Sequence, residues 1–166
     1  MTEKSDKTVL READNSDIQQ LSKHHLKMFE EIWQKKGEKI DISLCNEIEN
    51  AYARKLAQEL ADGTCKAWVI EYKNIIISSG AVSVVSLVPT PDDLSSNVAY
   101  LHSIYTEKEY RNRNFGSLIV QQAIQYSRDN GIRRIFLNSS EAGKPIYQKI
   151  GFRSSPETMR MFIKSN

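Results

Sequence analysis

Apolar residues in the first sixty positions recur every three or four residues, which is the period of a helix with one buried face. One such stripe predicts a helix over Ser16–Trp33, whose first residue forms a capping box with Gln19. A second stripe predicts a helix over Ser43–Ala61, and Gly63 beyond it is a natural left-handed cap. A short strand over Thr8–Ala13 is expected to precede both helices.

The period changes to two after this second helix. Alternating apolar and polar residues predict strands over Trp68–Tyr72 and Ile75–Val88, with Lys73-Asn74 as the turn between them. Pro89–Asn97 is rich in turn-forming residues and is expected to be an exposed loop. A third strand over Val98–Thr106 follows, so these strands should form an antiparallel meander.

The second half of the chain predicts a strand–helix–strand unit. The charged turn Glu107–Asn114 separates the third strand from an amphipathic helix over Phe115–Asn130. A connection of this kind places two parallel strands side by side in one sheet. The remaining expected elements are a strand at Arg134–Asn138, a helix near Pro145–Ile150 and a closing hairpin of Phe152–Arg153 with Met159–Ile163.

This order of elements predicts the α+β class, with a mixed, mostly antiparallel central sheet and flanking helices. The 166 residues suit one domain, and we expect a single domain over residues 7–166 behind a loose tail over residues 1–6. The longest apolar run, Ile75–Val88, contains polar residues and is shorter than the roughly 20 residues of a membrane helix. No membrane association is therefore expected.

The distribution of charge and the spacing of the cysteines argue against nucleic-acid binding and against a metal site. The net charge is +2 and basic residues are mixed with acidic ones, so the basic stripe of a nucleic-acid binder is missing from the sequence. Cys45 and Cys65 have neither a CxxC spacing nor a nearby histidine, so no metal site is expected. Reduced thiols and a polar, mixed-charge N-terminus without the pattern of a signal peptide favour a cytoplasmic protein.

The turn before the central helix is the first candidate for chemistry. Unpaired N–H groups and the helix dipole converge at such a helix start, and Arg111 and Arg113 stand beside it with Gly116. These features suit a phosphate cradle. The residues alone leave two alternatives. The turn could be an ordinary basic turn that caps a helix, or it could bind another phosphate compound such as a nucleotide.

Two motifs taken together resemble the GNAT superfamily of N-acetyltransferases. The segment YRNRNFGS resembles the Arg/Gln-x-x-Gly-x-Gly/Ala signature for acetyl-CoA, with Arg111 and Gly116 at its ends. The later segment GKPIYQKIGF resembles the superfamily's C-terminal motif, in which Tyr147, Gly151 and Phe152 match. One helix and one strand separate the motifs, as in that superfamily.

The resemblance implies a site for acetyl-CoA between two splayed parallel strands. By analogy, the backbone of Ile104, Tyr105 and Thr106 pairs with the pantetheine arm. The turn would surround the pyrophosphate through Arg111, Asn112, Arg113, Asn114, Phe115, Gly116 and Ser117. Two positions depart from the family pattern: Asn114 replaces the middle glycine, where asparagine is the best tolerated substitute at positive φ, and Ser140 replaces a frequent asparagine.

The same resemblance implies acetyl transfer to a primary amine by direct attack, through a tetrahedral intermediate. Tyr147 is the expected general acid for the leaving thiolate. His102 or Glu141 is the candidate base, against the alternatives of a hydrogen-bonded strand histidine and a solvated loop charge. The acceptor stays open among polyamines, aminoglycoside-like or amino-acid-like molecules and proteins. Analogy with the superfamily also suggests a homodimer. The alternative function is a non-catalytic acyl-CoA-binding or regulatory module on the same fold.

Overall fold

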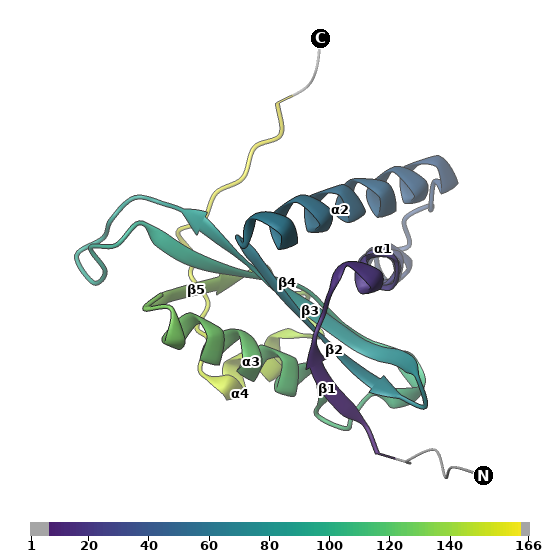
Figure 1. Ribbon diagram of the computed structural model, residues 1–166. Helices are drawn as coiled ribbons and strands as arrows, with labels where there is room; N and C mark the ends of the chain where they lie inside the picture. The colour runs from purple at the N-terminus through teal and green to yellow at the C-terminus, as the bar shows by residue number, and fades with distance from the viewer. Residues whose placement is uncertain (1–6, 164–166) are drawn as a thin grey trace.

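A five-stranded sheet lies between two pairs of helices in the computed structural model, which describes residues 7–163 (Figure 1). The strands follow the order β1-β2-β3-β4-β5 across the sheet. Neighbouring strands are antiparallel except for β4 and β5, which are parallel. The α+β class and the parallel pair are thus confirmed. The bounds of the strands are Val9–Glu12 (β1), Cys65–Tyr72 (β2), Ile75–Ser86 (β3), Asn97–Thr106 (β4) and Arg134–Leu137 (β5).

Helices α1 and α2 cover one face of the sheet, and α3 and α4 lie on the other (Figure 1). The first pair packs over a cluster that includes Leu21, Tyr52 and Leu56. The second face is built on a larger apolar cluster, in which Ile119 and Val120 of α3 are fully buried. The bounds of the helices are Ile18–Lys36 (α1), Ile42–Asp62 (α2), Phe115–Asp129 (α3) and Lys144–Ile150 (α4).

The start of the first helix differs from the prediction. A capping box does form, but Asp14 is the cap and Asp17 reaches back to its N–H, around a short 3-10 turn over Asn15–Asp17 that leads into α1. The predicted pairing of Ser16 with Gln19 is therefore wrong. Asp17 is held in this role because Arg11 on β1 binds both of its carboxylate oxygens, at 2.7 and 2.8 Å. Gly63 ends α2 in the left-handed region at φ 78°, as predicted.

The predicted closing hairpin is also wrong, because no strand forms within residues 151–163. Phe152 packs against Tyr147, but the chain then leaves the body of the molecule (Figure 1). Met159 and Phe162 are 94% and 83% exposed. An alternating pattern identifies a segment that is able to pair, but a ladder also requires a partner strand, which this segment lacks in the described chain. The expected tail over residues 1–6 lies outside the described residues.

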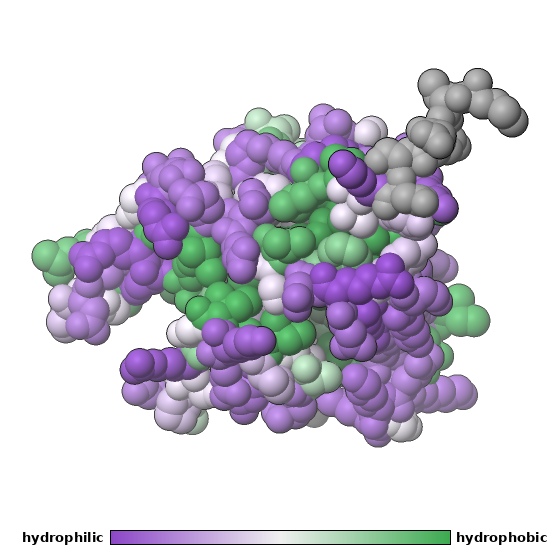
Figure 2. All heavy atoms as spheres, turned by 90° about the horizontal axis from the view of Figure 1, so that it is seen from below, coloured by the Kyte–Doolittle hydropathy of each residue, from purple (hydrophilic) through white to green (hydrophobic). Residues whose placement is uncertain are grey.

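The loop between β3 and β4 protrudes from the body at the left of Figure 1. Seen from below, apolar side chains are visible at its tip and again at the centre of the molecule (Figure 2). The exposed apolar residues of this loop are Leu87, Val88 and Leu94. An open hollow of about 540 Å³ at its base is lined in part by Arg134, which is already bound to Asp93 at 2.8 Å. We therefore place the candidate site elsewhere, at the opposite end of β4.

Candidate functional site

Strands β4 and β5 separate at the point where the sequence places the candidate site. Their ladder covers four residue pairs and ends with Leu101 opposite Leu137. Beyond it, β4 continues alone on that side as far as Thr106, while β5 ends. The splayed parallel pair is thus present, and the β5-facing edge of β4 is free to pair with another extended group.

A β-bulge in β4 lies directly at this splay. Ser79 of β3 pairs with Tyr105, and Ala81 pairs with His102, so Gly80 faces two residues, Ser103 and Ile104. Ser103 adopts a positive φ of 57°. A Cβ on Gly80 would lie 2.2 Å from Ile104 Cδ1, so glycine is the residue that leaves room for the bulge.

The bulge changes which side chains face the two helical layers. His102 and Ser103, although adjacent, both reach towards α1 and α2: His102 contacts Tyr52, and Ser103 contacts His25. Ile104 then turns to the α3 face and packs with its apolar cluster. Tyr105 returns to α1, where its hydroxyl lies 3.2 Å from Glu31. One extra residue therefore places two polar side chains together on the α1/α2 side of the splay.

The turn before α3 has the backbone geometry of an anion cradle. Asn112 and Asn114 both adopt positive φ, at 62° and 63°, and Asn114 is the N-cap of α3 without a side-chain cap bond. The N–H groups of Phe115, Gly116 and Ser117 have no hydrogen-bond partner within residues 7–163. These three donors and the dipole of a 15-residue helix point to one place beside the end of β4.

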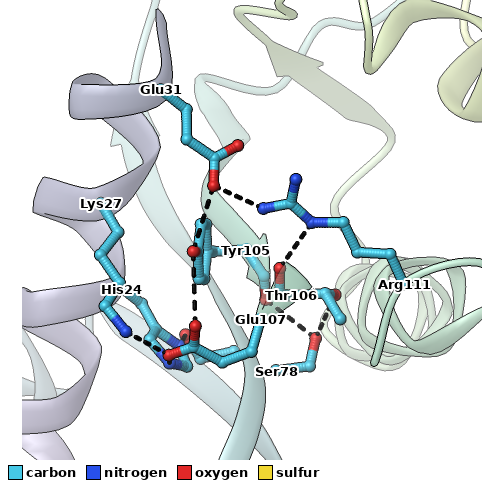
Figure 3. Close-up of polar contacts among 9 residues, drawn as sticks. His24, Lys27, Glu31, Ser78, Tyr105, Thr106, Glu107 and Arg111 are labelled. Atoms are coloured by element: carbon cyan, nitrogen blue, oxygen red, sulfur yellow. Dashed lines mark hydrogen bonds and ion pairs between the residues drawn. The ribbon is translucent and has the colours of Figure 1, made fainter. Parts of the chain in front are cut away.

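Arg111 binds protein groups beside this cradle (Figure 3). Its Nε donates to the Thr106 carbonyl at 2.9 Å, and its Nη2 donates to Glu31 at 2.7 Å. The hydrogen bond to Glu31 raises the pKa of the guanidinium. Arg113 lies over the ring of Tyr110, with 5.5 Å to the ring centroid. Arg111 thus links α1 to the turn, and a direct role for either arginine at a phosphate stays a prediction.

Glu107, directly after β4, connects this strand to α1 through polar contacts (Figure 3). Its carboxylate accepts a 2.5 Å hydrogen bond from Lys27 and lies 3.2 Å from Nε2 of His24. His24 is fully buried, and this burial lowers the pKa of its imidazole. Its Nδ1 lies 2.7 Å from the Ser79 hydroxyl. This part of α1 is therefore held to β3 and β4 by polar contacts as well as by packing.

Tyr147 lies on α4 with its ring half-buried against Phe152. Its hydroxyl makes no hydrogen bond with the described chain, and burial raises its pKa to about 12. A phenol in this state stays protonated at neutral pH and has its O–H available to a bound molecule. The side chain of Ser140 instead binds the backbone, because its Oγ accepts a hydrogen bond from the N–H of Gly143. Its contact with a cofactor stays a prediction.

The two candidate bases lie in contrasting environments. Glu141 is 96% exposed, and its nearest charged neighbour is Lys144 at 4.0 Å. His102 has a hydroxyl beside each ring nitrogen, with Tyr52 3.1 Å from Nδ1 and Ser83 2.9 Å from Nε2. Burial lowers the pKa of His102 to about 3. Its surroundings match the alternative of a hydrogen-bonded strand histidine.

Several polar residues at this site were not identified as functional in the sequence. Tyr52 lies within the second predicted helix, where its spacing is that of a core residue, and His25 belongs to no recognised motif. Both surround the bulge, together with Ser83 and Ser103.

No group of side chains suited to a metal ion occurs in the described part of the chain. None of its helices is long and apolar enough to cross a membrane.

Comparisons with known proteins agree with this geometry. The model of the acetyltransferase (GNAT) family matches residues 18–152. Glucosamine 6-phosphate N-acetyltransferase of Trypanosoma brucei brucei is 30% identical over 64 residues, which cover 39% of this chain and 44% of that protein. The chain is thus matched to less than half of this relative's length.

Two solved structures have a similar fold. A predicted acetyltransferase with acetyl-CoA from Clostridium acetobutylicum has a TM-score of 0.83 at 23% identity, over 94% of this chain and 96% of that chain. A GCN5-related N-acetyltransferase from Ralstonia eutropha JMP134 has the same TM-score at 21% identity, over 94% of this chain and 99% of that chain. At these identities the two likenesses establish the fold.

Proposed function

This chain belongs to the acetyltransferase (GNAT) family, and we propose that it transfers an acetyl group from acetyl-CoA to a primary amine. One observation carries the proposal: the free edge of β4 leads directly to the uncapped start of α3. An extended pantetheine arm fits the free edge, and a pyrophosphate fits the cradle. The two parts of acetyl-CoA therefore have adjacent sites of matching chemistry.

In the proposed complex the cofactor is held mainly by backbone groups. Ile104, Tyr105 and Thr106 pair with the pantetheine amides, and the N–H groups of the turn from Asn112 to Ser117 surround the pyrophosphate. Asn114 already has the left-handed conformation in which family members use glycine, so its side chain does not prevent the turn from forming. Arg111 and Arg113 add positive charge around it.

Direct attack requires a neutral amine and a protonated leaving group. A free alkylamine with a pKa near 10 is neutral in about one molecule in a thousand at pH 7, which is worth roughly 4 kcal/mol of barrier. A base must therefore take a proton from the bound ammonium. Tyr147 donates its phenolic proton to the departing thiolate, and a backbone N–H at the end of β4 stabilises the oxyanion of the tetrahedral intermediate.

Removal of the Tyr147 hydroxyl tests this function. We expect Tyr147→Phe to lower the rate of CoA thiol release about 100-fold, while acetyl-CoA still raises the midpoint of thermal unfolding as in the wild type. Tyr126→Phe is the matched control, because Tyr126 packs against Trp68 outside the site. Unchanged turnover in Tyr147→Phe would refute its role as the acid.

The acceptor is to be found with a panel of amines. The panel contains a polyamine, an aminoglycoside, an amino acid, a lysine peptide and glucosamine 6-phosphate, the substrate in the name of the trypanosomal relative. Acetyl-CoA should stabilise the wild type against heat, and ATP should not. Stabilisation by acetyl-CoA without thiol release on any amine would favour the non-catalytic acyl-CoA-binding module instead.

A further inference from the structure

The sheet has two outer strands, and only one of them is protected against pairing with a further strand. β1 carries Arg11 and Glu12 among its four residues, and charged side chains on an outer strand discourage pairing with another chain. Residues 135–137 of β5, in contrast, are all apolar. The side of β5 away from β4 pairs with no strand within residues 7–163. This edge of β5 is therefore both free and apolar.

The free edge of β5 adjoins other exposed apolar groups. Arg134, the first residue of β5, lines the hollow of about 540 Å³ together with Leu87 and Val88, which are both exposed. Further along the strand, Phe136 stays exposed although it stacks on Tyr100. We call the free edge and the hollow together the β5 surface. It offers main-chain hydrogen bonds beside a place for apolar side chains.

The last described residues of the chain have a complementary pattern. Residues 159–163 read Met-Arg-Met-Phe-Ile, and the four apolar side chains among them are between 81% and 94% exposed. In an extended strand, Met159, Met161 and Ile163 lie on one side and Phe162 on the other. A nearly continuous apolar run is typical of a strand that is covered on both faces. The segment therefore has the pattern of a packed strand.

This apolar segment does not pair with the β5 edge of its own chain. After Phe152 the chain leaves the body of the molecule, and residues 159–163 extend away from the sheet (Figure 1). Their backbone groups make no hydrogen bond with any group of residues 7–163. Each chain thus presents an unpaired edge and an unpaired apolar segment at the same time.

We propose that two copies of this chain form a dimer by exchange, in which residues 159–163 of each copy pair as an added strand with the free edge of β5 in the other copy. A twofold dimer uses both surfaces of both copies, so no unpaired edge or segment is left over. The added strand gains main-chain hydrogen bonds, and alternate side chains enter the apolar surface beside the edge. β5 also forms one side of the splay, so the exchange holds that side in place.

The area that such an exchange covers matches the area that a stable dimer needs. Full burial of one large apolar side chain removes about 60–120 Å² from water. Four such side chains from each copy, with the surfaces that they cover, bury on the order of 1,000–2,000 Å² in total. Specific and stable interfaces begin at about 1,200 Å². The exchange alone is therefore large enough to hold two copies together.

The mass in solution is the first test. Light scattering at micromolar concentration should give about twice the 19.0 kDa of one chain. Phe162→Asp places a charge in the exchanged strand and should weaken the dimer about 100-fold. Because Phe162 is exposed in the single chain, the circular dichroism spectrum of this variant should match that of the wild type. The control is Ile42→Asp, which changes an equally exposed apolar residue at the end of α2 far from β5 and should stay dimeric (Figure 1).

Hydrogen exchange is the second test, because it distinguishes exchange between copies from a segment that folds back onto its own chain. Amides of residues 135–137 and 159–163 should be protected together at high protein concentration. Both groups should lose this protection together on dilution below the Kd of the dimer. Amides of Ile119 and Val120, which are buried in α3, should stay protected at both concentrations and serve as the control.

Three results would overturn the proposal, and none of them depends on the acetyltransferase activity. A wild type that is monomeric at micromolar concentration has no exchange. A dimer that persists in Phe162→Asp is held together by another surface. Protection of the β5 edge that does not change on dilution would mean that each segment covers the edge of its own chain.

Discussion

The two faces of the sheet are built from different kinds of side chain. On the α3 side, strands and helix meet through aliphatic and aromatic groups, and Ile119, Val120 and Ala123 are fully buried there. The α1/α2 side contains all three histidines of the chain, His24, His25 and His102. Both faces belong to the same strands, because successive residues of a strand point to opposite sides.

This difference separates stability from chemistry. Apolar contacts are non-directional, so the α3 face stabilises the fold without fixing any group to a narrow geometry. Buried polar groups are costly unless each finds its partner, so the α1/α2 face is held in one arrangement by its hydrogen bonds. The proposed reaction needs such fixed groups, and they lie where the bulge brings His102 and Ser103 together.

Acidification should produce the largest effect, and it should act on the α1/α2 face. Burial lowers the pKa values of His25 and His102 to about 4 and about 3, whereas an unfolded histidine titrates near 6.5. Between pH 6.5 and about 4 the unfolded chain therefore binds more protons, and stability falls as the pH falls. Each histidine contributes about 1.4 kcal/mol per pH unit there, which denaturant unfolding at several pH values measures.

Two comparisons control the acid prediction. Replacement of His102 by Asn should reduce the slope of stability against pH by about one proton. Asp17, whose pKa is lowered by the Arg11 hydrogen bond, titrates below this window and contributes at lower pH. A slope that is the same in wild type and His102→Asn would contradict the neutral state of this imidazole.

Loss of packing on the α3 face should have the second largest effect on stability. Ile119→Ala leaves a cavity in the apolar cluster and should cost about 3 kcal/mol of unfolding free energy. Tyr52→Phe, on the α1/α2 face, removes one hydroxyl next to His102 and should cost about 1 kcal/mol. Denaturant unfolding of both variants at pH 7.5 compares the faces, and equal losses would contradict their different roles.

Gly80 lies opposite the bulge, and its substitution should lower the free energy of unfolding by less than Ile119→Ala does. The new methyl of Gly80→Ala would lie too close to Ile104 Cδ1 and to Ile119 Cγ2, at 2.2 and 2.8 Å. We expect a loss of about 1–2 kcal/mol. Ile104→Val removes the Cδ1 atom, so the double variant should lose less than the sum of the single ones in a double-mutant cycle. Additive losses would mean that the bulge does not bring these atoms together.

The link between Glu31 and Arg111 should have the smallest effect on stability. The pair is partly exposed and joins α1 to the turn before α3. Glu31→Gln should therefore cost about 0.5 kcal/mol, and the difference should shrink in 1 M salt. Thermal unfolding at low and high salt measures it, and Glu38→Gln, whose contact with Lys36 is exposed, is the control. A loss that does not change with salt concentration would show that Glu31 acts through its hydrogen bonds and not through its charge.

Local patterns determined the order of elements and the turn before α3. Helical and strand periods gave the two helices, the meander and the strand–helix–strand unit, because each period depends on neighbouring residues only. The left-handed conformation of Asn114 agrees with the tolerance of asparagine for positive φ, which the comparison with the family's glycine position had raised. The direction of the β4–β5 pair followed from chain connectivity.

Only the tertiary structure decided the bulge, the absence of the predicted hairpin near the C-terminus and the hydrogen bonds that His25 and His102 make beside the bulge. Ser103 carries no local signal for positive φ, and the space that permits it comes from Gly80 on another strand. His25 and Ser103 are 78 positions apart, so no short-range pattern pairs them. A hydrogen bond depends on where two distant groups meet, whereas a period depends on spacing along one segment. The sequence therefore determined where the turn before α3 lies, and the fold decided which polar side chains surround the bulge.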